Sequence, residues 1–358
     1  MKSGESIVGI SVCFCLGTCA GEILRAYTGS AATSICAAVL PVSVSLALLA
    51  FIRGMNLGRP VPRAAIFAVM TLTGLFASVA GSFRAGGASF APAMDAAGRL
   101  GWMIDGIPFA SADTSAVLKA FLIGDRSGLG RSVVELFRGS GASHLLALSG
   151  LHVGIIWSVL SRAGAILGNS RRARVVRYVL SIGTVGFFTL MTGAGPSICR
   201  AFLFILIRET AVLFGRKAEA QGVLFAALTI QLALTPWAIR SVGFQLSYLA
   251  AGGIILLFPS LGSVFPGKGP VKRIWDASML SLSCQAFTAP LAWYHFGSLP
   301  RFFLICNLLA IPLTTLVIFA GIVCITLTAA GCCPAAVIWS CDFLVSLLEK
   351  TLSVISRM

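Results

Sequence analysis

The chain has 358 residues, of which 57% are hydrophobic and only 11% are charged. A soluble domain usually carries about 25% charged residues, so this composition excludes an ordinary soluble domain and predicts a surface suited to a lipid bilayer. The 27 Lys and Arg residues outnumber the 12 Asp and Glu residues, giving a net charge of +15, which fits basic cytoplasmic loops and also suits a polyanionic partner.

Long apolar segments follow one another along the whole chain. A membrane-spanning helix needs about 20 mostly apolar residues. Such segments are expected at residues 7–24, 32–52, 64–82, 143–161, 177–193, 198–214, 221–235, 242–258, 277–293, 302–327 and 333–349. Two shorter apolar pieces, 115–123 and 132–138, could form re-entrant or interfacial helices. The sequence therefore predicts an all-α polytopic integral membrane protein, a bundle of roughly eleven transmembrane helices.

Basic residues gather in the loops that follow the second, fourth, sixth and eighth of these segments. They are Arg53, Arg59, Arg63, Arg162, Arg171, Arg172, Arg174, Arg177, Arg216, Lys217, Lys268, Lys272 and Arg273. If all face the cytoplasm, the crossings alternate with a cytoplasmic N-terminus and an extracytoplasmic C-terminus. We expect residues 1–82 to form N-terminal transmembrane helices, 83–114 a short extracytoplasmic segment, and 115–358 the main membrane domain.

Polar residues inside apolar sequence are the candidates for function, because such groups are costly in a membrane. The densest region is Gly124 to Leu129 followed by Gly141 to Gly154, which opens an expected span with two Ser and two His residues. Its candidate residues are Asp125, Arg126, Ser143, His144, Ser149 and His152.

Three interpretations of this region are open. Ser and His could tie helices together, could line a water-filled path, or could act as a nucleophile and its base. Ser149 and His152 share a helix face if the helix is regular. Neither a G-x-S-x-G nor an H-E-x-x-H string occurs, which weakens the catalytic interpretation.

Three further polar strings follow. In the string Gly193 to Arg200, Gly and Pro break the helix pattern, so Arg200 lies near the start of a span. Its side chain could extend to the membrane interface or could face a path for anions. In the string 241–248, Gln245 and Ser247 lie in an apolar helix, where Gln usually bonds to another helix. In the third string, Asn307 precedes Pro312. A helix that is kinked at Pro312, with a local hydrogen bond to the Asn307 side chain, would explain these two residues.

Taken together, these strings resemble the ComEC family of bacterial competence proteins. Beyond the Gly-Asp-Arg-Ser string, the family's Ser-His-Leu-Leu-Ala-(Ile/Leu)-Ser-Gly-Leu-His-Val-Gly run is matched at Ser143 to Gly154. Its Pro-Ser-x-x-Arg-Ala string is matched at Pro196 to Ala201, and its Gly-Phe-Gln-Leu-Ser string at Gly243 to Ser247. Its Asn-Leu-Leu-Ala-Ile-Pro-Leu string is matched at Asn307 to Leu313, so the resemblance covers about residues 115–330 in the family's order.

The resemblance implies a channel that passes single-stranded DNA across the bacterial cytoplasmic (inner) membrane during natural transformation. Its partners would be DNA-capture proteins, a cytoplasmic helicase and a separate nuclease. The residues implied for the DNA path are Asp125, Arg126, Ser143, His144, Ser149, His152, Arg200, Gln245, Ser247 and Asn307. The alternatives are a small-molecule permease and an intramembrane hydrolase that uses Ser149 and His152.

The chain departs from the fuller family pattern in two places. Many family members carry an OB-like domain where this chain has only Arg84 to Thr114, which is too short for a five-stranded barrel. Many also end in a metallo-β-lactamase-like domain, whereas this sequence contains no H-x-H-x-D-H string. No CxxC pair occurs either. We therefore expect a channel without enzymatic activity, metal or cofactor.

Overall fold

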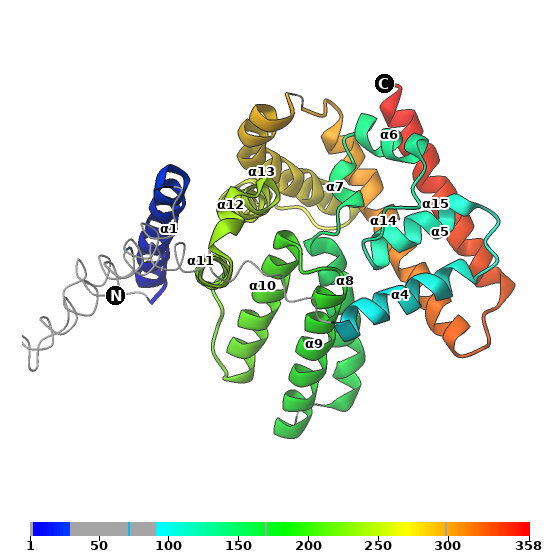
Figure 1. Cartoon of the computed structure of the whole chain (residues 1–358), viewed down its shortest axis with the longest axis horizontal. Coiled ribbons are helices and arrows are strands. Elements are labelled where there is room, and N and C mark those ends of the chain that lie inside the picture. Colours follow the sequence, from blue (N-terminus) through cyan, green and yellow to red (C-terminus); the bar gives the residue numbers. More distant parts are fainter. Residues whose placement is uncertain (1–2, 29–70, 72–90, 169, 298) are drawn as a thin grey trace, which may run out of the picture. The chain divides into compact units, whose positions relative to one another are not determined.

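The protein is helical throughout the part that the computed structural model describes, which is residues 3–28, 71, 91–168, 170–297 and 299–358 (Figure 1). The α-helices are α1 (Ser3–Thr28), α4 (Ala91–Asp105), α5 (Ala112–Leu122), α6 (Arg131–Gly139), α7 (Ser143–Leu146), α8 (Gly150–Gly164), α9 (Arg171–Met191), α10 (Pro196–Leu213), α11 (Ala220–Leu234), α12 (Val242–Ser263), α13 (Pro270–Phe296), α14 (Phe303–Ala329) and α15 (Ala335–Ser356). Within the same described residues, two 3₁₀ helices, η2 (Ala165–Leu167) and η3 (Pro236–Arg240), connect longer elements.

Nearly all of the expected spans within the described residues coincide with one long helix. Among the residues that the structure describes, three helices, α9, α12 and α14, are long and apolar enough to cross a membrane, while α11 and the part Ser11–Ala20 of α1 are apolar but shorter. These helices support the prediction of a membrane protein. The full set of roughly eleven spans stays a prediction, and the spans expected at 32–52 and 64–82 lie outside the described residues except for Thr71.

The span expected at 143–161 is wrong in one respect, because the helix is interrupted. α7 ends at Leu146, and Ala147 has an extended backbone with ψ 126°. α8 then begins at Gly150, with Ser149 as its N-cap residue at φ −126° and ψ 173°. A Ser side chain competes for backbone hydrogen bonds, so it favours a helix start over a helix interior.

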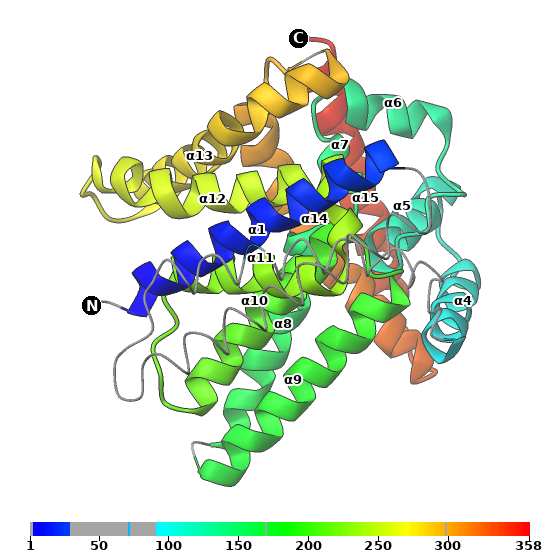
Figure 2. The ribbon, with the colours of Figure 1, turned by 60° about the vertical axis from the view of Figure 1, so that its left-hand side comes forward.

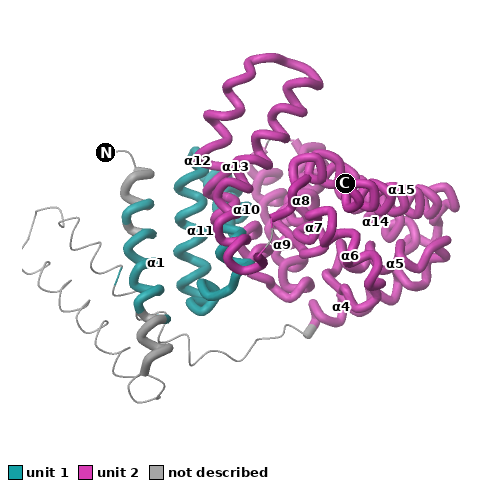
Figure 3. The backbone as a smooth tube through the Cα atoms, turned by 90° about the horizontal axis from the view of Figure 1, so that it is seen from above, with its two compact units in different colours: residues 1–88, 203–248 teal, residues 89–202, 249–358 magenta. Residues whose placement is uncertain are grey.

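The described residues form two compact units that interleave along the chain (Figure 3). Unit 1 comprises 1–88 with 203–248, and unit 2 comprises 89–202 with 249–358. α10 and α12 each pass from one unit to the other. The division of the chain into 1–82, 83–114 and 115–358 stays a prediction.

In unit 1, α1 packs against α11 and η3. The Ser11 hydroxyl donates to the Phe225 carbonyl at 3.1 Å, and the Thr229 hydroxyl donates to Ser11 Oγ at 2.8 Å. Arg240 Nε lies 2.8 Å from Glu22 Oε2, whose side chain is only 4% exposed. A buried carboxylate is stable only when it is paired, so this ion pair fixes η3 against α1.

The core of unit 2 lies where α5 packs against α14 and α15, which run side by side (Figure 2). Seven of the eleven residues of α5 are buried, and Phe121 is fully enclosed. The apolar piece expected at 115–123 therefore forms a mostly buried helix, and its re-entrant or interfacial position stays a prediction. Its apolar side chains face the core, while Ser115 and Lys119 face Asp105 of α4. The piece expected at 132–138 forms α6, which buries only Val133 and Phe137.

α4 was not expected from the sequence. It forms within the segment predicted to be a short extracytoplasmic connection, and it packs against α5, α9 and α14. Its composition mixes Gly, Asp and Arg with apolar residues, so a search for long apolar runs passes over it.

Candidate functional site

Ser149 and His152 form a reciprocal cap at the start of α8. The Ser149 hydroxyl oxygen accepts from the Leu151 N–H at 3.3 Å, and the Ser149 N–H donates to His152 Nδ1 at 3.2 Å. This is the geometry of a capping box, with His in the place usually held by Glu or Gln. Because Nδ1 accepts a backbone hydrogen bond, the neutral ring carries its proton on Nε2.

The His152 ring is enclosed by protein. It is 1% exposed and makes an edge contact with Phe121 of α5, with ring centroids 5.7 Å apart. Its Nε2 is buried without a hydrogen-bond partner. Ser149 Oγ also lies 3.2 Å from Nδ1, the separation of a nucleophile and its base. However, the Nδ1 lone pair already accepts from a backbone N–H, and a carboxylate that would orient the ring is not bonded to Nε2.

The start of α8 also lies against α10. A Cβ atom added to Gly150 would be 3.4 Å from the Ala201 Cβ and 3.5 Å from Arg200 Nη2. The chain reaches Arg200 through a tight turn in which Gly193 and Ala194 both have positive φ, 80° and 50°. The guanidinium of half-buried Arg200 is thereby placed beside the backbone of α8.

Two glycines bring other motif strings to the same part of unit 2. Gly124 has φ 81°, and a Cβ atom there would overlap the Leu148 side chain. Gly141 has φ 82°, and a Cβ atom there would overlap the Pro300 ring. The Gly-Asp-Arg-Ser loop therefore packs against the segment before α8, and the turn before α7 packs against the segment that leads into α14.

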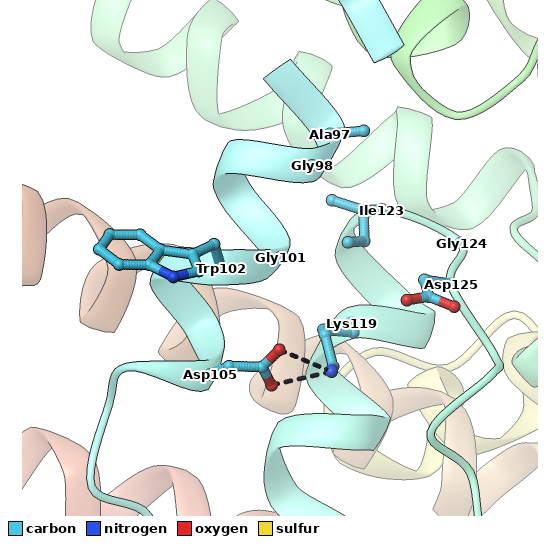
Figure 4. A pocket seen from close by; sticks show the side chains of 9 residues that line it. All are labelled: Ala97, Gly98, Gly101, Trp102, Asp105, Lys119, Ile123, Gly124 and Asp125. Carbon is cyan, nitrogen blue, oxygen red and sulfur yellow. Dashed lines mark hydrogen bonds and ion pairs between the residues drawn. The ribbon is translucent and has the colours of Figure 1, made fainter. Parts of the chain in front are cut away.

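The Gly-Asp-Arg-Ser loop forms one wall of a pocket of about 470 Å³ (Figure 4). The lining residues are Ala97, Gly98, Gly101, Trp102 and Asp105 of α4, with Lys119, Ile123, Gly124 and Asp125. Asp105 and Lys119 point toward each other and form an ion pair at 2.8 Å, while Trp102 is directed away from that pair. The pocket thus has a polar, charged side next to the loop.

Hydrogen bonds keep both pocket carboxylates ionised. The Lys119 and Ser115 side chains lower the pKa of Asp105, and hydrogen bonds from Ser127 lower the pKa of Asp125. The Ser127 N–H donates to Asp125 Oδ1 at 2.9 Å, which closes the turn of the loop. Both groups therefore remain negatively charged at neutral pH.

The other predicted residues have different surroundings. Arg126, Ser143 and His144 are exposed in unit 2. Asn307 was expected to bond locally, but its Oδ1 is buried without a hydrogen-bond partner. Gln245 and Ser247 belong to unit 1, where Gln245 Nε2 donates to the Ile239 carbonyl at 2.7 Å. That bond ties α12 to η3, so it supports the structural interpretation of Gln245.

Two contacts around α5 were missed by the sequence reasoning. Asp342 of α15 accepts from the Thr114 hydroxyl at 2.7 Å and from the Ala110 N–H at 2.9 Å, which fixes the start of α5. Phe121 makes an edge contact with the buried His152 ring. An Asp within an apolar span was the available signal for the first, whereas Phe121 resembles any core residue. Among the described residues, no group of three or more potential metal ligands comes together.

The sequence model of the family described as Competence protein matches residues 121–358, well over half of the chain. The chain belongs to the competence-protein family. It is 27% identical over 211 residues to ComE operon protein 3 of Bacillus subtilis, covering 59% of this chain and 26% of that protein. It is 30% identical over 210 residues to competence protein ComA of Neisseria gonorrhoeae, covering 56% of this chain and 29% of that protein.

A third relative is the uncharacterised protein YcaI of Escherichia coli, 27% identical over 208 residues, covering 57% of this chain and 28% of that protein. The chain thus spans less than a third of the length of these relatives. No solved structure matches the chain. The residues matched by the family model, 121–358, include the whole site around α8.

Proposed function

We propose that this protein forms a path for single-stranded DNA across the bacterial cytoplasmic membrane during natural transformation. The observation that carries the proposal is the convergence of separate family strings in unit 2. The loop after α5, the start of α8 and the start of α10 contact one another through Gly124, Leu148, Gly150 and Ala201. A shared location is what a transport path requires, whereas strings that only stabilise their own helices need not meet.

The charge around this site suits a polyanion. Arg200 lies beside the start of α8, and exposed Arg126 lies in the loop that packs against the segment before it. From Leu136 to Arg208 the sequence contains neither Asp nor Glu. Single-stranded nucleic acids are bound in positively charged grooves that follow the phosphate backbone. We therefore propose that Arg126 and Arg200 contact phosphates.

The remaining predicted path residues are given separate roles in this proposal. Exposed Ser143 and His144 would contact the strand, while the ionised Asp125 would hold the loop through the hydrogen bond that it accepts from the Ser127 N–H. Half-buried Ser149 and buried His152 would shape the path by fixing the start of α8. Asn307 would line the path from α14. Gln245 and Ser247 would act in unit 1, where Gln245 supports η3.

The proposed setting is the inner membrane, with the N-terminus in the cytoplasm and the C-terminus outside. DNA-capture proteins would deliver DNA from outside, a cytoplasmic helicase would act on the inner side, and a separate nuclease would remove the other strand. These partners follow from the resemblance to competence proteins. A non-enzymatic role fits the capping geometry of Ser149, whose hydroxyl oxygen accepts from the Leu151 N–H.

Gene replacement tests the proposal against both alternatives. Deleting the gene in a competent host should lower transformation by several orders of magnitude. A complementing gene with Ser149→Ala should restore it to within about fivefold, because loss of an N-cap costs only about 1 kcal/mol. Transformation frequency is measured with membrane protein level as the control. An unchanged frequency after deletion would rule out the DNA path, and a fully inactive but normally folded Ser149→Ala variant would favour the hydrolase.

A further inference from the structure

Four exposed arginines gather where α8 is followed by α9. Arg162 lies near the end of α8, and Arg171, Arg172 and Arg174 lie in the first turn of α9. The two helices pack against each other, and the stem of Arg177 covers Gly164, 2.9 Å from the position of an added Cβ atom. The end of α8 and the start of α9 therefore lie at the same end of this helix pair. These four arginines are called the α8–α9 basic cluster.

The charges of this cluster are not balanced by the protein. Among the described residues, none of the four arginines forms an ion pair. The first turn of a helix favours acidic residues, since the helix dipole is positive there, but α9 has none in that turn. Three arginines at this end repel one another and the dipole. Such a local conflict is typical of a site that meets an anionic partner.

An aliphatic stripe continues directly from the basic cluster. Val175, Val176, Val179 and Leu180 of α9 are 43–58% exposed, and Ile166 before α9 is 88% exposed. α9 is one of the helices long and apolar enough to cross a membrane. Arginines at the start of such a helix lie at the depth of lipid headgroups, with the stripe next to the acyl chains.

We propose that the α8–α9 basic cluster is a binding site for an anionic phospholipid. Its phosphate would contact the guanidinium groups of Arg171 and Arg174, which share a face of α9, because Arg binds phosphate through paired N–H donors. Arg162 and Arg172 would add to the positive potential around it. The acyl chains would lie along the aliphatic stripe. A nucleic-acid site would need aromatic side chains for base stacking, but Tyr178, which is half-buried, is the only aromatic residue between Ser158 and Gly186.

The test uses the purified full-length chain in mild detergent and native mass spectrometry of retained lipid. Wild-type protein should retain phosphatidylglycerol roughly 30-fold more tightly than phosphatidylcholine. The triple variant Arg171→Gln, Arg172→Gln, Arg174→Gln should bind phosphatidylglycerol roughly 20-fold more weakly, which removes most of that preference. The corresponding triple Lys variant should keep most of it, because the positive charge remains.

The matched control changes the same number of exposed cations elsewhere, with Arg216→Gln, Lys217→Gln and Arg273→Gln. This variant should change phosphatidylglycerol affinity less than about threefold. Equal losses in the two Gln variants would overturn the proposal. A wild-type protein without preference for phosphatidylglycerol would also overturn it, and that result needs no variant to fold.

A 20-nucleotide DNA strand is added as a competitor. If the triple variant loses DNA binding while lipid retention is unchanged, the cluster binds DNA and the lipid proposal is wrong.

Discussion

Replacing Arg200 with Glu is expected to lower transformation roughly 100-fold, which corresponds to about 3 kcal/mol. The guanidinium of Arg200 lies 3.5 Å from the position of a Cβ atom on Gly150, beside the start of α8. A carboxylate there would repel the phosphates of an entering strand. The new carboxylate would also be half-buried, in place of the guanidinium that normally occupies this position. The measurement is the number of transformants per cell, normalised to the amount of protein in the membrane.

Two control variants separate the sign of the charge from the loss of packing. Arg200→Lys keeps the charge and should retain transformation to within about tenfold, since a single ammonium contacts fewer phosphate oxygens. Arg216→Glu makes the same charge change at an exposed position just after α10 and should have less than about a threefold effect. If Arg200→Lys and Arg200→Glu are equally impaired, Arg200 does not act through its charge.

Among Gly→Ala changes between Gly141 and Gly154, Gly141→Ala should destabilise the protein most. The residue has φ 82°, which a side chain rarely adopts, and the new Cβ would overlap the rigid Pro300 ring. The combined strain should cost about 2–4 kcal/mol. It should separate the turn before α7 from the segment leading into α14. The measurement is the thermal unfolding midpoint of the purified protein in detergent.

Gly154→Ala is the matched control for this change. Gly154 lies inside α8 without a positive φ, and an added Cβ atom would meet nothing within 4 Å. Because Ala favours a helix interior over Gly by about 1 kcal/mol, this variant should be neutral or slightly more stable. A Gly141→Ala variant that unfolds at the same temperature as Gly154→Ala would show that the Gly141–Pro300 contact does not hold these segments together.

The positions of the long helices could be predicted from the sequence, because apolar length is a local property. The expected segment 302–327 is α14, Phe303–Ala329, and the expected segment 177–193 lies almost wholly within α9, Arg171–Met191. The break before α8 was missed because the apolar run continues through it. It depends on the hydrogen bonds of Ser149 and His152, and a Ser three residues before a His is compatible with either a helix interior or a capping box.

The candidate site could be predicted only in part, because burial and pairing depend on residues far apart in the chain. The sequence placed His152 in a path or a structural cluster, and its ring is enclosed by Phe121 from another helix. Similarly, the Asp105–Lys119 ion pair joins α4 and α5 beside the Gly-Asp-Arg-Ser loop. Neither residue belongs to a family string, so spacing within the motifs gave no signal for that pair.

DNA internalisation tests the central proposal most directly. The strain should carry this gene as its sole member of the family, and the cells should receive labelled DNA followed by external nuclease. The proposal predicts that label becomes nuclease-resistant and single-stranded in the cytoplasm of wild-type cells, and that Arg200→Glu lowers this amount roughly 100-fold while surface-bound label stays constant. Equal cytoplasmic label in the wild-type and gene-deleted strains would contradict a DNA path through this protein.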